Sequence, residues 1–337
     1  MLVVSFSRSN IMQQGIETQT FENDCLCSGQ LVRHDHAYVD KTKFIEILER
    51  GRILYPYIVR PHNFGKTLFT YILQAYYDKA LADQFDRNFK GTYIFDHKTE
   101  LANSLRVLHI DFSHLNLDSG VEVYLERVKA GIADFATRYP NKKADELLKS
   151  KYSSLGILLD DFLIANDNFN EPQLFVIIDE NAYYHSDFAN LYNDGPNSAL
   201  LRELNGFFLN LKSATVNNNV DRVFTTGTKA TDVRSDDIAP YPLGFDIVRD
   251  ISAFPQYASM FGFTRAELVT LIHNMVNLEQ LGFGVDEVVA GIQQALLEYQ
   301  FSRDSDITVF EPVAVFNFLQ QFSSRIRVSA SPGNGLG

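Results

Sequence analysis

Two groups of residues in this chain have the types and spacing that phosphate chemistry needs. The first lies in Arg60-Pro61-His62-Asn63-Phe64-Gly65-Lys66-Thr67-Leu68, where Gly-Lys-Thr separates an apolar run at 53–59 from a helix-like run. In a phosphate-binding loop, backbone N–H groups at the helix start meet the anion, a lysine reaches the outer phosphates and a threonine hydroxyl ligates Mg²⁺. The order of strand, tight loop and helix therefore predicts a nucleotide-binding loop that uses Lys66 and Thr67.

This loop departs from the full pattern G-x-x-x-x-G-K-[ST] at its first position, where the chain has Arg60 followed by Pro61. Gly-Lys-Thr by itself also occurs at ordinary helix starts. Pro56 is a second irregularity, because a central strand needs the N–H that proline lacks. The prediction of a nucleotide site therefore needs support from elsewhere in the chain.

The second group, Asp179 and Glu180, follows the unbroken apolar run Leu174–Ile178. Such a run is typical of a parallel strand buried on both faces, and sheets of this kind place their chemistry at the carboxyl ends of the strands. In nucleoside triphosphatases the acid at this position holds Mg²⁺ and an adjacent glutamate orients the attacking water. Asp179 is therefore a candidate Mg²⁺ ligand beside Thr67, and Glu180 is a candidate catalytic residue. The alternative interpretation is a strand end capped by two solvated acids.

Seven segments, in this order along residues 37 to 325, carry a resemblance to a known family. They are Tyr38-Val39-Asp40-Lys41-Thr42, Arg60 to Leu68, Ala75-Tyr76-Tyr77-Asp78, Leu108 to Ser113, Val176 to Glu180, Phe224 to Lys229, and Phe261 to Thr264 with Glu267 and Leu268. With these segments the chain resembles the AAA-ATPase-like family, P-loop ATPase domains often joined to a C-terminal restriction-like PD-(D/E)XK nuclease domain. That family tolerates Arg-Pro in place of the first loop glycine. We expect no nuclease half in this chain.

The resemblance implies an α/β fold, with a P-loop NTPase-like parallel sheet flanked by helices and a small helical C-terminal domain. It implies ATP and Mg²⁺ as ligands, and ATP hydrolysis that drives a conformational change. Thr226 or Thr228, at the end of the next strand, would sense the γ-phosphate, and Arg234 or Arg249 would be the arginine finger. The nucleotide-binding residues implied by the resemblance are Arg60, Asn63, Phe64, Gly65, Lys66, Thr67 and Leu68.

Departures from the family pattern keep a second class of function open. The chain has His62-Asn63 where the family usually carries two basic residues, and Asn181-Ala182 where it usually carries Tyr-Asp. Fewer basic residues weaken the electrostatic attraction for phosphates. The alternative is therefore a degenerate, non-hydrolysing nucleotide-binding or protein-interaction module. A nuclease in its own right is disfavoured, because no D-x(n)-[ED]-x-K pair stands out.

Several nearby side chains have two interpretations. Tyr38 or Lys41 would flank the nucleotide by family resemblance, but packing and a surface ion pair are the simpler roles. Asp111, at the end of a second predicted strand, could support Mg²⁺, orient Lys66 or cap a turn through Ser113, and we favour the cap. His109 lies in an apolar run and is expected to be a hydrogen-bonded core residue.

Periodicity and composition divide the chain into segments. Apolar residues at helical spacing from Ser198 to Lys212 predict a helix on the sheet, and Thr264 with Glu267 predicts a capping box. The predicted segments are a flexible arm at 1–36, the ATPase-like α/β domain at 37–250 with a helical insertion at about 121–165 as a lid or inserted subdomain, a lid-like helical C-terminal domain at 251–326 and a disordered tail at 327–337.

The 337 residues include 45% apolar and 21% charged residues, which predicts a globular protein of two domains. The net charge of -12 argues against direct nucleic-acid binding by bulk attraction. No apolar run reaches the length of a membrane span and no secretory signal stands out, so we expect a cytoplasmic protein. Cys25 and Cys27 are expected to be free thiols, with zinc binding alongside His34 and His36 as the remote alternative. The expected partners are a nucleotide and either another protein or further copies of the chain.

Overall fold

The computed structural model describes residues 38–115, 117–167, 170–180, 198–228, 246–276, 278 and 282–329. The predictions made for the arm at 1–36 lie outside these residues. So do those for Arg234, for Asn181-Ala182, for Cys25 and Cys27, and for the tail from residue 330 onwards.

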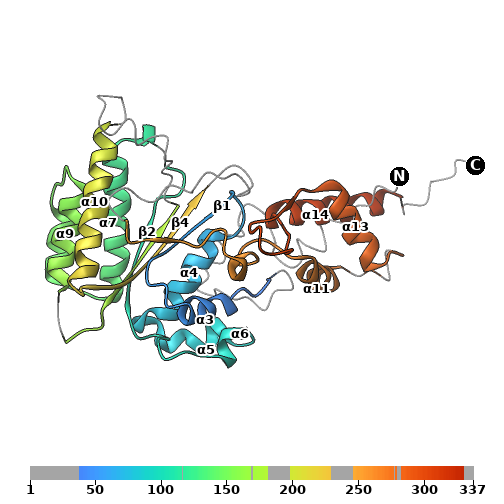
Figure 1. Ribbon diagram of the computed structural model, residues 1–337, viewed down its shortest axis with the longest axis horizontal. Helices are drawn as coiled ribbons and strands as arrows, with labels where there is room; N and C mark the ends of the chain where they lie inside the picture. Colours follow the sequence, from blue (N-terminus) through green and yellow to red (C-terminus); the bar gives the residue numbers. More distant parts are fainter. Residues whose placement is uncertain are drawn as a thin grey trace, which may run out of the picture.

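Five parallel strands form the central sheet in the order β2-β3-β4-β1-β5. Helices cover both faces of this sheet, which confirms the predicted α/β class (Figure 1). The elements are α3 (Lys43–Arg50), β1 (Pro56–Arg60), α4 (Lys66–Tyr77), η1 (Lys79–Gln84), α5 (Phe85–Phe89), α6 (Tyr93–Asp96), β2 (Arg106–Asp111), η2 (Leu117–Ser119), α7 (Val121–Arg138), α8 (Lys142–Lys149), α9 (Leu155–Asn166), β3 (Leu174–Asp179), α10 (Ser198–Val216), β4 (Val220–Thr228), β5 (Arg249–Asp250), η4 (Pro255–Tyr257), α11 (Arg265–Met275), α13 (Val285–Ala295), β6 (Glu298–Tyr299), β7 (Val309–Phe310) and α14 (Pro312–Ser329).

The apolar runs of the sequence become strands because both faces of the sheet are covered. Every residue of β1 and β3 is buried. Pro56 causes no conflict in this arrangement, since it is the first residue of β1, where a missing N–H is tolerated. The backbone of the β5 segment supplies the hydrogen bonds along this edge of β1. The N–H of Arg249 donates to the carbonyl of Tyr55 at 2.8 Å, and the N–H of Ile251 donates to the carbonyl of Tyr57 at 2.9 Å.

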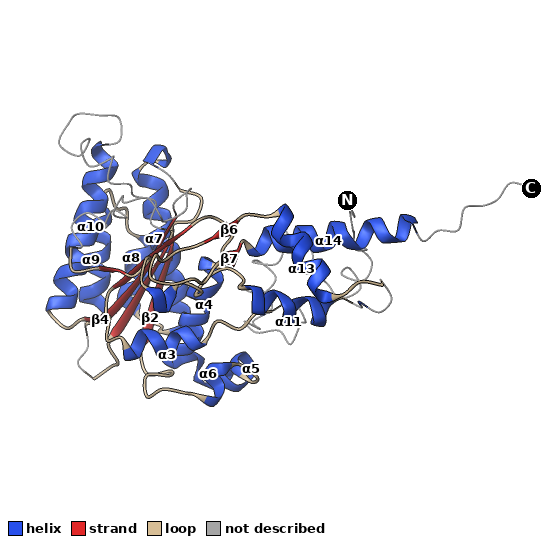
Figure 2. Ribbon diagram, turned by 45° about the vertical axis from the view of Figure 1, so that its right-hand side comes forward, coloured by secondary structure: helices blue, strands red, loops and turns tan. Residues whose placement is uncertain are grey.

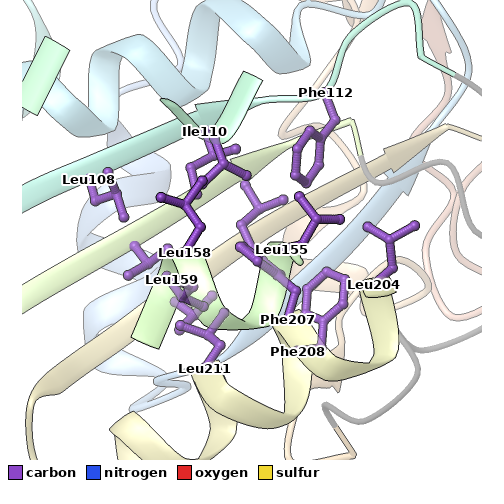
Figure 3. Packing of buried hydrophobic residues seen from close by; sticks show 14 of the residues in the cluster. Leu108, Ile110, Phe112, Leu155, Leu158, Leu159, Leu204, Phe207, Phe208 and Leu211 are labelled. Carbon is purple, nitrogen blue, oxygen red and sulfur yellow. The ribbon is translucent and has the colours of Figure 1, made fainter. Parts of the chain in front are cut away.

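Helices α7, α9 and α10 cover one face of the sheet (Figure 1). Leu108 and Ile110 of β2 meet Leu158 and Leu159 of α9 in this layer, and the stripe of α10 completes it with Leu204, Phe207, Phe208 and Leu211 (Figure 3). The helices predicted at 121–165 therefore form, but they are a layer of the core. Their apolar faces pack on the sheet. That the insertion acts as a lid or inserted subdomain stays a prediction.

Helices α3 and α4 cover the opposite face, together with the short helices α5 and α6 (Figures 1 and 2). Side chains alternate along each strand, so Phe175 and Ile177 of β3 and Phe224 of β4 point into this second cluster. The same alternation places Asp179 and Thr226 on the α4 side at the carboxyl edge. The sheet thereby directs its polar strand ends toward the start of α4.

The C-terminal helices α11, α13 and α14 share a hydrophobic cluster of their own and extend away from the sheet (Figure 2). Thr264 begins α11 with the predicted capping box: its hydroxyl accepts from the N–H of Glu267, whose carboxylate accepts from the N–H of Thr264 at 2.8 Å. The two-stranded pair β6–β7 lies between these helices and the sheet. Within the described part of the chain, no helix combines the length and apolarity that crossing a bilayer requires.

Gly131 of α7 tests how tightly this helix contacts the sheet. A Cβ atom at Gly131 would lie 2.5 Å from the backbone oxygen of His109 in β2, whereas one at Gly206 of α10 would meet nothing within 4 Å. We expect Gly131→Ala to lower the free energy of unfolding by about 2 kcal/mol or more, because backbone cannot move aside cheaply. The control Gly206→Ala should raise it by about 0.5–1 kcal/mol through helix propensity. Urea unfolding measures both, and equal effects would contradict the packing of α7 on β2.

Candidate functional site

The loop between β1 and α4 has the backbone shape of an anion site. Asn63 and Gly65 both adopt left-handed conformations, with φ of 64° and 89°. The added Cβ of a residue at position 65 would meet no described atom within 4 Å, so the loop is open on that side of the described structure. Gly65 is the N-cap of α4, and no side chain among the described residues caps this helix. The start of α4 therefore offers its N–H groups and positive dipole end to an anion.

Lys66 places its ammonium group inside this loop. Its side chain is buried, and Nζ donates to the carbonyl oxygens of Pro61 at 2.9 Å and Arg60 at 3.2 Å. These bonds hold a positive charge at the base of the loop. The same charge favours the ionised form of Asp179 at the end of β3. The loop and the strand end predicted to cooperate are thus electrostatically coupled.

Asp179 is the most perturbed acid of the site. Burial raises the pKa of its carboxyl to about 6, and the nearby charge of Asp111 acts in the same direction. The side chains of Thr226 and Thr67 and the ammonium of Lys66 oppose this rise. Oδ1 accepts the Thr226 hydroxyl at 2.5 Å, whereas Oδ2 is buried and has no hydrogen-bond partner among the described residues.

This donor set fits Mg²⁺ carried by a phosphate ligand. Mg²⁺ usually takes one or two protein oxygens and fills its octahedron with water and substrate phosphates. Oδ2 of Asp179 supplies such an oxygen, and the Thr67 side chain lies near enough to affect its ionisation. Across the described ranges, no group of three or more His, Cys, Asp or Glu residues could hold a metal without such a ligand.

Thr226 joins the two acids. Its hydroxyl donates to Asp179 and accepts from the backbone N–H of Glu180 at 2.9 Å, and its side chain is fully buried. A γ-phosphate sensor needs a free hydroxyl hydrogen, and here that hydrogen is directed at Asp179. The structure therefore shows Thr226 fixing the acid pair, and its contact with the γ-phosphate stays a prediction.

Glu180 is held from two sides. Its φ of 55° is unusual for a residue other than glycine. Oε1 accepts the Thr228 hydroxyl at 2.8 Å and lies 3.3 Å from Nδ1 of His62, which belongs to the phosphate-binding loop. Sequence reasoning missed this role of His62, because nothing local links positions 62 and 180. Only the rule that parallel strand ends share one edge could have brought them together.

Arg60 is placed differently from the prediction. Its guanidinium is fully buried, stacks on the ring of Phe301 at 4.1 Å, and donates to the carbonyls of Ser252 and Tyr257, each at 3.0 Å. Burial lowers the pKa of Arg60 to about 9, and the charge of Asp250 partly offsets this. This side chain attaches β1 to the C-terminal segment, and only its backbone lines the loop.

The side chains of three further residues predicted to bind nucleotide make contacts within the protein. The Phe64 ring is buried and meets Tyr299 and Phe301 edge-on, with centroids 5.0 and 5.4 Å apart. Leu68 packs against the α4-side cluster. Asn63 is exposed, and its amide donates to Glu311 at 3.0 Å. For Phe64 and Leu68, any nucleotide contact is left to the backbone.

The structure shows the contacts or positions of four further residues whose roles were considered from the sequence. Asp111 caps its turn, as we favoured, by accepting from the N–H of Ser113 at 2.7 Å. His109 is a core residue 3.0 Å from the Gln74 amide, and burial lowers its pKa to about 4. Lys41 pairs with Glu267 at 2.7 Å. Arg249 lies level with Pro56 at the amino end of β1, so it does not face this chain's own loop.

Comparison with known families gives one match that spans these features. A family model described as a predicted AAA-ATPase matches residues 28–238, more than half of the chain. The matched region contains the loop between β1 and α4, the acid pair after β3 and the threonines of β4. A search of curated proteins found no match.

Replacing Asp179 should change how the free energy of unfolding depends on pH. Its raised pKa means that the folded protein binds this proton more tightly than the unfolded chain does, so stability falls as pH rises from near 3.8 through 6. Asn carries no such charge. We expect the gain in unfolding free energy of Asp179→Asn over wild type to grow by about 2 kcal/mol between pH 4 and pH 8. Denaturant unfolding across this range measures it, with the exposed Asp160→Asn as control. A pH-independent gain would contradict the burial of a charge at Asp179.

Two adjacent threonines of β4 provide a matched pair of substitutions. Thr225 is equally buried, but its hydroxyl has no partner among the described residues. Thr226→Val should therefore cost about 1–3 kcal/mol in unfolding free energy, because Asp179 and the N–H of Glu180 each lose a bond. Thr225→Val should be close to neutral. Thermal or urea unfolding distinguishes them, and an equal loss would mean that the hydroxyl of Thr226 is not a bridge.

Proposed function

The chain belongs to the AAA-ATPase-like family of predicted AAA-ATPases, and from this premise we propose that it binds ATP with Mg²⁺ and hydrolyses it to ADP and phosphate. The observation that carries the proposal is that Lys66 lies near enough to Asp179 for its charge to lower the pKa of the buried carboxyl. A buried ammonium at the start of a helix and a buried carboxylate at the end of a strand lie at one edge of the sheet. A fold has little reason to bury two such charges unless a ligand completes their environment.

The loop would bind the phosphate groups of ATP. The N–H groups at the start of α4 would donate to phosphate oxygens, and the open side at Gly65 would let the phosphates approach the backbone closely. Lys66 would exchange its two carbonyl acceptors for the outer phosphates, which bind an ammonium group more strongly because they are charged.

Thr67 and Asp179 would hold the Mg²⁺. When bound, the ion would neutralise charge that develops on the phosphate oxygens. The protein's own part is to present Oδ2 of Asp179, which has no hydrogen-bond partner among the described residues, and to keep Oδ1 fixed by Thr226. A carboxylate with a raised pKa gains most from a cation, because ion binding removes the cost of keeping its charge buried.

Glu180 would orient the water that attacks the γ-phosphoryl group. Its carboxylate is mostly buried, with 13% of the side chain exposed, and it stands next to the residue that would hold the metal. The hydrogen bond from Thr228 restricts its orientation. A positioned carboxylate beside the phosphate groups supplies the alignment on which phosphoryl transfer chiefly depends.

Turnover would be used to change conformation. Loop residues Arg60, Asn63 and Phe64 contact the C-terminal segment, so movement of the loop would be passed to the helices beyond it. We propose a cytoplasmic setting and a protein partner or further copies of the chain as the recipient of this movement.

A second function is supported by a specific observation at the loop. Asn63 is engaged by Glu311 and His62 by Glu180, so the positions that usually carry basic residues are paired with acids in this chain. A site with this charge balance would bind ATP weakly and turn it over slowly. The second candidate is therefore a nucleotide-binding or protein-interaction module that does not hydrolyse ATP.

Calorimetric titration with Mg²⁺-ATP tests the binding half of the proposal. Lys66→Ala should weaken binding by about tenfold to a hundredfold, because a charge-assisted bond to phosphate is lost. Lys149→Ala, which removes an exposed lysine at the end of α8, is the matched control and should bind like wild type. Absence of binding by wild type at millimolar ATP would refute the nucleotide site altogether.

Phosphate release tests the hydrolytic half. Glu180→Gln should lower kcat by about 10²-fold or more while ATP binding persists, because the amide cannot accept a proton from water or align it as well. Glu146→Gln changes an exposed glutamate of α8 in the same way and should leave kcat unaltered. Binding that depends on Lys66 without any turnover would favour the non-hydrolysing module.

A further inference from the structure

A contact between the phosphate-binding loop and the end of β3 is not used by the proposed reaction so far. Nδ1 of His62 lies 3.3 Å from Oε1 of Glu180, and the two side chains are 68% and 13% exposed. This distance lets Nδ1 donate to the carboxylate in the tautomer that carries its hydrogen there. The loop thus reaches the water-orienting carboxylate directly through one side chain.

The remaining contacts of Glu180 show why this one matters. Its backbone N–H is bound by Thr226 and its Oε1 by Thr228, so β4 holds the residue from one side only. Its left-handed backbone would relax if those bonds failed. His62 approaches from the loop, with Nδ1 3.3 Å from the same oxygen, and neither side-chain contact uses Oε2.

The backbone on both sides of His62 is held in place by packing of the neighbouring loop residues. Phe64 is packed between Tyr299 and Phe301, and Asn63 is tied to Glu311. The backbone on the C-terminal side of His62 is therefore set by packing. On its other side Pro61 is buried next to Arg60. Although the imidazole is mostly exposed, its Cα is not free to move away from Glu180.

We propose that His62 is a positioning residue for Glu180. Its Nδ1–H and the Thr228 hydroxyl clamp Oε1 from the loop and from β4, which turns Oε2 toward the water that attacks the γ-phosphoryl group. The inference rests on the proposed ATPase function and adds to it the means by which the carboxylate is aligned with the phosphate-binding loop. His62 acts through Glu180 and does not itself bind phosphate.

Two roles for His62 predict different kinetics. A positioning residue affects the chemical step, so its removal lowers kcat and leaves the Kd for Mg²⁺-ATP unchanged. A phosphate ligand contributes to ATP binding, so its removal raises the Kd. The Asn side-chain nitrogen can occupy about the place of Nδ1, which makes His62→Asn the conservative variant that keeps the donor.

Single-turnover hydrolysis and calorimetric binding of Mg²⁺-ATP test the proposal on the full chain. We expect His62→Ala to lower the rate about tenfold to a hundredfold, the size of effect that misalignment produces, with Kd unchanged. His62→Asn should recover most of this loss. His97→Ala is the matched control, since His97 is also exposed but stacks on Tyr93 away from the site.

Nuclear magnetic resonance of ring-labelled histidine tests the contact without ATP. Glu180→Gln should shift the His62 resonances and leave those of His97 in place. A raised Kd with an unchanged rate in His62→Ala, or a normal rate in that variant, would overturn the positioning role while wild-type turnover preserved the ATPase. Failure of wild type itself to hydrolyse ATP would refute the ATPase and the role of His62 together, and the two failures are distinguished by the wild-type rate.

Discussion

A single buried carboxylate constrains much of this structure. Asp179 sits where the sheet is covered on both faces, and water that would stabilise its charge is excluded. The protein compensates with a threonine hydroxyl on one oxygen and a nearby ammonium group. This compensation is incomplete, because Oδ2 keeps no partner among the described residues. The strand order, the face of α4 and the threonines of β4 all serve to place this unsatisfied oxygen beside the loop.

A buried cation sets a second constraint on the same loop. Arg60 occupies the place where the usual pattern has a glycine, and its guanidinium is directed away from the phosphate side. Three carbonyl oxygens and the face of Phe301 receive it. A glycine would remove the side-chain donations to these three carbonyls. The residue that looks like a defect in the motif is therefore the attachment of the loop to the C-terminal segment.

Features set by residues close together in the sequence could be predicted, whereas those set by contacts between distant residues could not. The apolar run at Leu174–Ile178 and the stripe on α10 were sufficient to predict their elements, because burial on a sheet imposes a local periodicity. The helices from Val121 to Asn166 were predicted as elements, but the surface they cover could not be predicted, since periodicity shows that a face is buried and not against what. Thr226 and His62 show the same limit at the site. Their roles depend on partners far away in sequence, Asp179 and Glu180, and on strand ends that only the fold brings together.

The attachment of Arg60 also sets an order of events during synthesis. Its acceptors at Ser252 and Tyr257 lie more than 190 residues downstream, and Phe301 is further still. A growing chain can assemble the sheet from β1 to β4 long before these groups leave the ribosome, but it cannot yet fix the loop. Contacts of such sequence separation form late, because closing the intervening chain costs entropy. The loop would thus take its final shape only after synthesis has passed Phe301, so shorter nascent chains would present the candidate site unformed.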